Sequence, residues 1–365
     1  MTSPPVAGQI HLVVFIHGYE GASTDFDNCE RVLIRKVQSE TRTDETVTTL
    51  KLKANSGFGG TYDGIESGAV RLWKELTKRM QDLTKKFGSE IKALSVVGHS
   101  LGGLYARYLV RLLNDCFVFE AIEPRFFITL ASPHLSTRRP QRGAFNVMFQ
   151  SFGQIINKTT NEMFMEDDPI QPILYRMTEE SFIQPLRQFK RRILYSNVIN
   201  DFQVYFCTGS ISVRNPYVKD GASMERSDAY SDITAWSLKN VRKRMQHDLI
   251  ADGDIDKFAV GDPKAHLLRA MFLRLNDLLW ERYEAVFSTL FAHEQIIFKR
   301  SFFAGSKVAK HLSDGILDYP SVAPTRKNSE DEEEDAYASA DDGDSSSFNK
   351  TGTDNVGSAT TLASL

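Results

Sequence analysis

The chain has 365 residues, of which 41% are hydrophobic and 25% are charged, and its net charge is −3 at pH 7. A soluble chain of this length and composition buries one large core, or two smaller ones, without a metal or disulfides. Its three cysteines, Cys29, Cys116 and Cys207, are widely spaced and form no CxxC pair, which argues against a disulfide framework and a cysteine zinc site.

No apolar run approaches the roughly 18 residues that span a bilayer. The first residues, MTSPPVAGQI, lack the basic and apolar regions of a secretory signal. We therefore expect a cytoplasmic protein, in which the sequons at Asn157 and Asn349 carry no glycan.

The composition changes near Thr325. Residues 325–365 carry ten acidic and three basic side chains and few large apolar ones, so they predict a disordered tail after a domain of residues 1–324. Without the tail, the chain has a net charge of +4. A mildly basic body suits either an ordinary solvated surface or a weak peripheral contact with a membrane or lipid droplet. We expect no nucleic-acid partner.

Within residues 1–324, strand patterns alternate with helix patterns. Apolar runs typical of strands lie at 10–16, 93–97, 126–131 and 192–198, and amphipathic helical stretches lie at 26–40, 63–87 and 101–115. Because apolar runs without alternation are typical of strands buried on both faces, the sheet is expected to be mostly parallel. The pattern predicts a doubly wound α/β fold.

The segment VVGHSLGG, residues 96–103, joins a predicted strand to a predicted helix. In this context Gly-x-Ser-x-Gly predicts a nucleophile elbow, a strained turn that exposes the hydroxyl of Ser100. Gly98 and Gly102 are required because side chains there would collide with the adjacent helix and strand. The turn places Ser100 at a helix N-terminus, where the helix dipole and free N–H groups favour negative charge.

A serine nucleophile needs a base, a carboxylate that orients the base, and donors for the oxyanion. The segment VVFIHGYEG places Tyr19 just after the first predicted strand. We expect the backbone N–H groups of Tyr19 and Leu101 to form the oxyanion hole. His17 is expected to be a structural turn residue, because in this type of site the base comes last in the chain.

The residues alone leave the base open. By position alone, His311 is a reasonable candidate, although its helix-like surroundings favour packing. Asp201, just past the fourth predicted strand, is the nearest candidate acid, and the later aspartates suit a solvated loop. The histidines that follow a plausible acid are His247, His266, His293 and His311, and the later aspartates are Asp220, Asp228 and Asp232.

Several blocks of the chain together resemble the serine-esterase and lipase family of the α/β-hydrolase superfamily, in its fungal, plant and protist branch. These blocks are VVFIHGYEGASTDF, TYDGIESGAVRL, VVGHSLGGLYARY, FITLASPHL, GQIINKTTNEMFMED, FKRRILYSNVINDFQVYFCTGSI and WERYEAVFSTLFAHEQIIFKR, and they span roughly residues 10–300. The resemblance implies an α/β-hydrolase fold and a Ser-Asp-His triad.

The resemblance implies a further strand that begins after Trp280 and Arg282. The family's base follows that strand in an Ala-His pair, which makes it His293. The family's acid corresponds to Asp201 in the pair Asn200-Asp201. The order Ser100, Asp201, His293 is that of α/β-hydrolases. Three features depart from the family: Tyr19 occupies a position that is commonly leucine, Val204-Tyr205-Phe206 stand where relatives often carry proline or tryptophan after the acid, and residues 212–258 do not align.

Residues 140–190 form an insertion between two core strands that is unusually dense in phenylalanine and methionine. We expect it to lie above Ser100 as a helical cap, where an apolar cover suits an acyl chain and excludes water. The alternative is a helical subdomain that packs a small core of its own.

Together these features predict a carboxylic ester hydrolase, a lipase acting on mono- or diacylglycerols or phospholipids, with no metal or cofactor. A thioesterase or an acyltransferase would use the same triad. A non-catalytic lipid- or protein-binding module on a hydrolase fold is an alternative of another class, since a fold does not dictate function.

Overall fold

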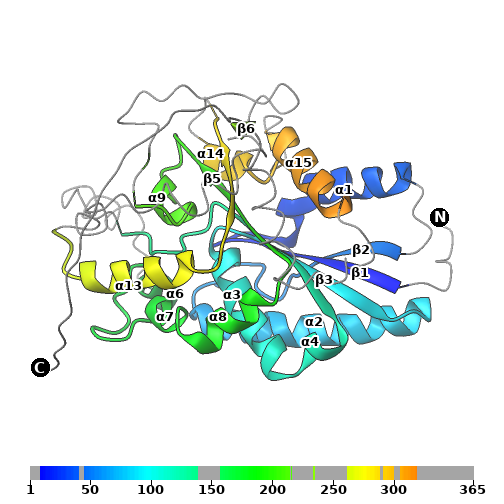
Figure 1. Ribbon diagram of the computed structural model, residues 1–365, viewed down its shortest axis with the longest axis horizontal. Coiled ribbons are helices and arrows are strands. Elements are labelled where there is room, and N and C mark those ends of the chain that lie inside the picture. The colour runs from blue at the N-terminus through cyan, green and yellow to red at the C-terminus, as the bar shows by residue number, and fades with distance from the viewer. Residues whose placement is uncertain are drawn as a thin grey trace, which may run out of the picture. The chain divides into compact units, whose positions relative to one another are not determined.

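The computed structural model describes residues 9–40, 45–138, 157–213, 215, 233–234, 261–287, 291–299 and 305–318 (Figure 1). Several predictions fall outside these residues. They concern the disordered tail at 325–365, the first part of the cap at 140–156, the candidate base His247, and the aspartates Asp220, Asp228 and Asp232.

The described strands form one sheet in the order β2-β1-β3-β4-β5-β7-β6. Neighbouring strands are parallel except β6, which is antiparallel to β7. The strands are β1 (Gln9–Ile16), β2 (Glu45–Lys51), β3 (Ile91–His99), β4 (Glu123–Leu130), β5 (Arg191–Asn197), β6 (Ile233–Thr234) and β7 (Glu281–Ala285).

Helices cover both faces of the sheet, with α2, α3 and α8 on one side and α1 and α15 on the other (Figure 1). The first group is α2 (Ile65–Phe87), α3 (Leu101–Asp115), α4 (Val118–Ala121), α6 (Lys158–Met163), α7 (Ile173–Arg176), α8 (Glu180–Arg187) and α13 (Ala265–Asn276). The others are η1 (Ser23–Phe26), α1 (Asp27–Ser39), α9 (Phe206–Gly209), α14 (Ala292–Gln295) and α15 (Ser306–Leu317).

The alternation of side chains along each strand explains the two layers. In β1, Leu12 and Val14 belong to the core shared with α2 and α3, whereas Val13 and Phe15 belong to the core shared with α1 and α15. Successive residues of a strand point to opposite faces, so a continuous apolar run is what a sheet covered on both sides requires. The doubly wound prediction is thereby confirmed.

Helix α2 ends at a glycine, and a glutamate distant in the sequence bonds its N-terminus. Gly88, with φ of 59°, ends the helix in the left-handed conformation that glycine adopts most readily. At the other end, the Glu162 carboxylate accepts a hydrogen bond of 2.5 Å from the backbone N–H of Ile65. A negative charge there complements the helix dipole and satisfies one of the free N–H groups.

The described part of the predicted cap, residues 157–190, packs into the core of the domain. Leu174, Phe182 and Leu186 are buried in the same apolar cluster as Leu104 and Leu109 of α3. The buried Arg107 of α3 also donates a hydrogen bond of 2.7 Å to the carbonyl of Met177. These residues therefore extend the layer of helices on the side of the sheet that α3 covers.

The parallel register brings the carboxyl ends of the central strands to one edge of the sheet. Ile16 at the end of β1 pairs with Gly98, and Leu130 at the end of β4 pairs with His99 of β3. The segments that follow β1, β3, β5 and β7 contain Tyr19, Ser100, Asp201 and His293 respectively. A parallel sheet with helices on both faces and a strand-turn-helix serine at this edge is the α/β-hydrolase fold.

Candidate active site

Ser100 occupies a strained turn between β3 and α3. Its φ and ψ are 53° and −127°, a left-handed φ that a residue with a side chain rarely adopts. Its backbone N–H donates a hydrogen bond of 2.9 Å to the carbonyl of Leu130, which holds the turn against β4. The residue is largely buried, with 7% of its surface exposed.

Close backbone packing around this turn requires glycine at three positions. A Cβ on Gly98 would lie 2.6 Å from the carbonyl oxygen of Gly102 in α3. One on Gly102 would lie 2.6 Å from the carbonyl oxygen of His17, after β1. One on Gly18, which sequence reasoning did not single out for this role, would lie 2.8 Å from the Cβ of Ser100. The segment after β1 therefore lies directly against the nucleophile.

His293 and Asp201 form a buried pair. The Nδ1 of His293 lies 3.0 Å from Oδ2 of Asp201 and donates its proton to that oxygen, which leaves Nε2 without one. The same carboxylate accepts hydrogen bonds from the side chain of Asn197 at 2.7 Å and from the N–H groups of Gln203 and Val204 at 3.0 and 2.8 Å. The carboxylate is thus fixed, and it fixes the tautomer of His293.

The electrostatics of the pair suit a base. Burial alone would raise the pKa of the Asp201 carboxyl, but the charge and hydrogen bond of His293 outweigh it and hold this pKa below its usual range. Burial alone would lower the pKa of His293, but the Asp201 carboxylate outweighs it and raises this pKa above its ordinary value. Asp201 therefore stays ionised near neutral pH and stabilises a proton on His293.

His99, the last residue of β3 and the residue before Ser100, contacts His293. His99 donates from Nε2 to the backbone carbonyl of His293 at 2.9 Å, and the two rings have centroids 4.7 Å apart. In the part of the chain that the structure describes, no direct hydrogen bond joins the Ser100 hydroxyl to His293. Such bonds commonly tighten only when substrate binds.

His17 supports the turn that follows β1. Its Nδ1 donates to the carbonyl of Gly18 at 3.0 Å, and its Nε2 accepts from the hydroxyl of Ser56 at 3.0 Å. Burial lowers the pKa of His17 below its ordinary value, so the ring is neutral near pH 7. Both nitrogens are occupied by the fold, as expected for a structural turn residue.

The segment Gly18–Gly21 presents a free amide near Ser100. The N–H of Gly21 donates to the carbonyl of Gly18 at 3.1 Å, and the N–H of Glu20 donates to the Thr61 hydroxyl at 3.1 Å. Among the described residues, the backbone N–H groups of Tyr19 and Leu101 have no acceptor. Two unpaired amides flanking a buried serine are the donors that an oxyanion needs.

The alternative base His311 lies elsewhere in the fold. It belongs to α15, where its Nδ1 bonds the hydroxyl of Tyr195 at 2.7 Å and its ring packs 4.4 Å from that of Tyr283. Burial lowers the pKa of His311 to about 4. It therefore packs within the core beside α1.

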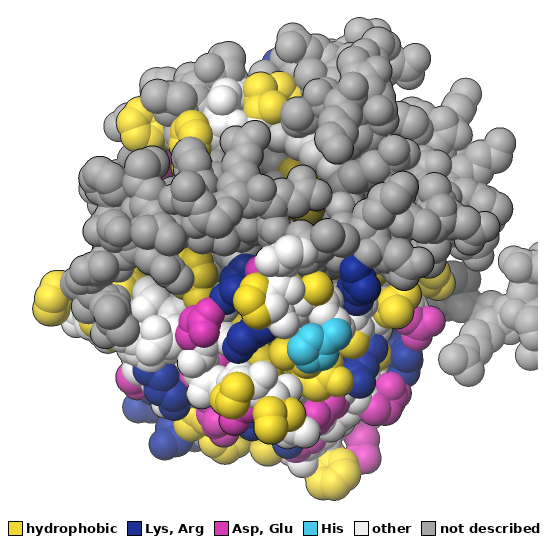
Figure 2. All heavy atoms as spheres, turned by 90° about the vertical axis from the view of Figure 1, so that its left-hand side faces the viewer, with side chains coloured by type: hydrophobic (Ala, Val, Ile, Leu, Met, Phe, Trp, Pro, Cys, Tyr) yellow, Lys and Arg dark blue, Asp and Glu magenta, His cyan; other side chains and the backbone are white. Residues whose placement is uncertain are grey.

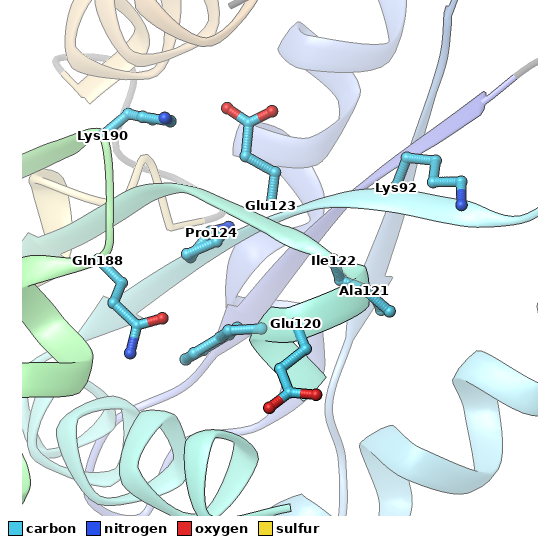
Figure 3. Close-up of a pocket in the computed structure, with 9 residues that line it drawn as sticks. Lys92, Glu120, Ala121, Ile122, Glu123, Pro124, Gln188 and Lys190 are labelled. Atoms are coloured by element: carbon cyan, nitrogen blue, oxygen red, sulfur yellow. The ribbon is translucent and has the colours of Figure 1, made fainter. Parts of the chain in front are cut away.

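A hollow of about 500 Å³ lies at the opposite edge of the sheet from Ser100 (Figure 3). Lys92, Glu123 and Lys190 stand at or just before the amino ends of β3, β4 and β5, whereas Ser100 follows the carboxyl end of β3. The hollow takes no part in the candidate site. No cluster of three or more metal-ligating side chains occurs among the residues that the structure describes.

The face of the molecule in Figure 2 shows basic, acidic and apolar side chains interspersed over its described part. That part has no stripe of a single charge sign, the feature typical of nucleic-acid binding. Of the helices in the described ranges, none has both the length and the apolarity to cross a membrane.

Known proteins resemble this chain in sequence. "Putative lipase ROG1" of Saccharomyces cerevisiae is 33% identical over 207 residues, which cover 55% of this chain and 28% of the relative. "Putative lipase C4A8.10" of Schizosaccharomyces pombe is 32% identical over 217 residues, which cover 56% and 26%. The chain thus spans about a quarter of the length of these curated relatives.

Among solved structures, the peroxisomal alpha-beta-hydrolase Lpx1 of Saccharomyces cerevisiae is similar with a TM-score of 0.38 and 12% identity, covering 91% of this chain and 86% of that one. Residues 7–213 match the family described as "Putative serine esterase (DUF676)", which is more than half of the chain and includes β1, the elbow and Asp201. The chain belongs to this serine esterase family.

Proposed function

We propose that this protein is a carboxylic ester hydrolase that uses Ser100 as nucleophile, His293 as general base and Asp201 as the residue that orients the base. The observation that carries the proposal is the buried hydrogen bond of 3.0 Å between His293 and Asp201, beside a serine on a strained elbow. A hydroxyl is a weak nucleophile unless an adjacent base removes its proton, and this pair supplies that base.

In the acylation step, Nε2 of His293 takes the proton of the Ser100 hydroxyl while Oγ forms a bond to the ester carbonyl carbon. The carbonyl oxygen becomes an oxyanion and accepts hydrogen bonds from the N–H groups of Tyr19 and Leu101. The bond between the carbonyl carbon and the alcohol oxygen then breaks, and the imidazolium of His293 returns the proton to the leaving alcohol. An acyl-enzyme on Ser100 remains.

In the deacylation step, His293 takes a proton from a water molecule as the water oxygen attacks the acyl carbonyl. The bond to Oγ breaks, His293 returns the proton to Ser100, and the carboxylic acid leaves. Asp201 stays ionised throughout and stabilises each imidazolium through the bond to Nδ1. No metal or organic cofactor takes part in these steps.

We further propose that the substrates are lipid esters, such as acylglycerols or phospholipids. The names of the curated relatives support a lipase. Two apolar side chains beside the pair also support it, since Phe202 adjoins Asp201 and is 46% exposed, and Phe291 lies two residues before His293 and is 56% exposed. Exposed aromatic groups at the rim of a site favour an apolar substrate or a peripheral contact with lipid.

Labelling with a fluorophosphonate probe tests the chemistry. We expect the wild type and the surface control Ser39→Ala to be labelled and Ser100→Ala to be silent. An unlabelled wild type would contradict the proposal and favour a binding module. Labelling that persists in Ser100→Ala would contradict Ser100 as the nucleophile. Incubation of the wild type with defined acylglycerols, phospholipids, short-chain esters and acyl thioesters, with products identified by mass, tests the substrate class. Transfer of the acyl group to an added alcohol would reveal an acyltransferase.

A further inference from the structure

His99 is the middle residue of the elbow sequence Gly98-His99-Ser100, and its ring is buried. Its Nε2 lies 2.9 Å from the backbone carbonyl oxygen of His293. Because a carbonyl oxygen only accepts, Nε2 carries the proton and donates it. The strand that ends at the nucleophile thus holds, through one side chain, the backbone of the residue proposed as its base.

The other nitrogen of the same ring lacks a partner. Nδ1 of His99 is buried and makes no hydrogen bond within the described structure. A buried acceptor without a donor costs stability, and a phenyl ring would avoid that cost. The same ring would take the Nε2–H donor away from the carbonyl of His293, which costs stability in turn. The two effects oppose each other, so folding alone gives histidine no large advantage over phenylalanine here.

The rings of His99 and His293 also contact each other, with centroids 4.7 Å apart and planes inclined at 45°. Burial lowers the pKa of His99 well below its ordinary value, and His293, Lys299 and His17 lower it further. His99 therefore stays neutral while His293 gains and loses a proton. A neutral ring beside an imidazolium adds no repulsion between charges.

We infer that His99 is a positioning residue for the reaction: its Nε2–H fixes the backbone of His293 over the elbow, so that the base faces Ser100. The inference rests on the proposed function of Ser100 and His293. A positioning residue acts by fixing the geometry of a catalytic group. A displacement of about 1 Å at a base is enough to lower turnover about 100-fold.

Two variants of His99 distinguish a role in positioning His293 from a role in packing alone. His99→Phe keeps the ring but removes the donor, and His99→Gln keeps a donor of similar reach without the ring. We expect His99→Phe to lower kcat by about 100-fold with little change in KM. Its melting temperature should change little, because the lost bond to the carbonyl offsets the removal of the unpaired Nδ1. His99→Gln is expected to recover at least about tenfold of that loss in kcat, because the bond to the carbonyl can re-form.

The inference is overturned if His99→Phe retains the wild-type kcat. It is equally overturned if both variants lose kcat to the same extent. A second measurement does not need ester hydrolysis: proton NMR follows the Nδ1–H of His293, which is bonded to Asp201. We expect this resonance to be sharp in wild type and His99→Gln and exchange-broadened in His99→Phe. A sharp resonance in all three overturns the inference even if the protein proves not to be an esterase.

Discussion

The side-chain amide of Asn157 donates a hydrogen bond of 2.7 Å to the phenol oxygen of Tyr19. Asn157 also caps α6, because its Oδ1 accepts from the N–H of Thr160 at 3.0 Å. One asparagine therefore ties the insertion between β4 and β5 to the segment that carries a proposed oxyanion donor. The ring of Tyr19 is held further by stacking on Tyr62, with centroids 5.6 Å apart.

This contact makes Tyr19→Phe informative. The phenyl ring keeps the stacking and the backbone N–H, while the bond to Asn157 is lost. We expect kcat for an ester substrate to fall about tenfold, the equivalent of one ordinary hydrogen bond, with little change in KM. Steady-state kinetics measure both constants.

The matched control for this variant is Tyr175→Phe, which removes the phenol of the insertion that accepts a hydrogen bond of 3.1 Å from Arg274 of α13. We expect its kcat to equal that of the wild type. Equal losses in the two variants would mean that the insertion responds as a whole and that Tyr19 has no particular role in placing the donor.

The dependence of kcat/KM on pH tests the base. His293 acts only when neutral, and the Asp201 carboxylate, which outweighs burial, raises the pKa of His293. We expect the acid limb of the profile to have its midpoint above the ordinary histidine value of about 6.5. The lowered pKa of His99 adds no second limb in this range. A midpoint well below that of free histidine would contradict the assignment.

Asp201→Asn tests the orienting residue. An asparagine side chain keeps the size of aspartate but presents an amide, which favours the wrong tautomer of His293 and removes the charge that stabilises its proton. We expect kcat to fall by about 10⁴-fold, as in other triads, and the acid limb to move to lower pH. Asp277→Asn, at an exposed ion pair with Arg187, is the control and is expected to leave both unchanged.

Much of the fold is predictable from local patterns. The apolar runs at 10–16, 93–97, 126–131 and 192–198 correspond to β1, β3, β4 and β5, because strands buried on both faces need apolar residues throughout. The edge strand β2 was missed. Its sequence ETVTTLK alternates buried and half-buried positions and carries three threonines, so it lacks a continuous apolar run. The strand β7 was inferred only through the family resemblance.

The candidate site also contains parts that the sequence predicts and parts that it does not. The elbow is a local sequence feature, and Gly98 follows from contacts within a few residues, whereas Gly102 is required by the carbonyl oxygens of Ile16 and His17 at the end of β1. Asp201 and His293 are 92 residues apart, and His99 and His293 are 194 apart. Strand order decides which distant segments meet, and spacing along the chain does not encode that order. The structure alone revealed the contacts of Asn157, Asn197 and His99.

The elbow glycines give a prediction about stability. A Cβ on Gly102 would collide with the carbonyl oxygens of Ile16 and His17, and neither backbone can move without disturbing β1. We expect Gly102→Ala to lower the free energy of unfolding by about 3 kcal/mol or more, as severe overpacking does. Gly209→Ala is the control, because its Cβ would meet only ordinary contacts from 3.4 Å outward. Urea denaturation compares the two, and equal effects would contradict the close packing described for the elbow.

The last prediction concerns the His293–Asp201 pair in the absence of turnover, measured in a Ser100→Ala background. The folded-state pKa of His293 is raised, so its protonation stabilises the fold. That contribution is fully present below the unfolded pKa of about 6.5 and is lost as pH rises through the folded pKa. Asp201 remains ionised over this range, because its pKa is lowered.

Replacing His293 with glutamine should therefore cost more stability near pH 5 than near pH 9, by up to about 1.4 kcal/mol for each unit of pKa shift. Denaturant melts of Ser100→Ala and Ser100→Ala/His293→Gln at the two pH values measure the difference. A cost that is independent of pH would show that the imidazole gains nothing from the Asp201 carboxylate, and the proposed base would lose its electrostatic support.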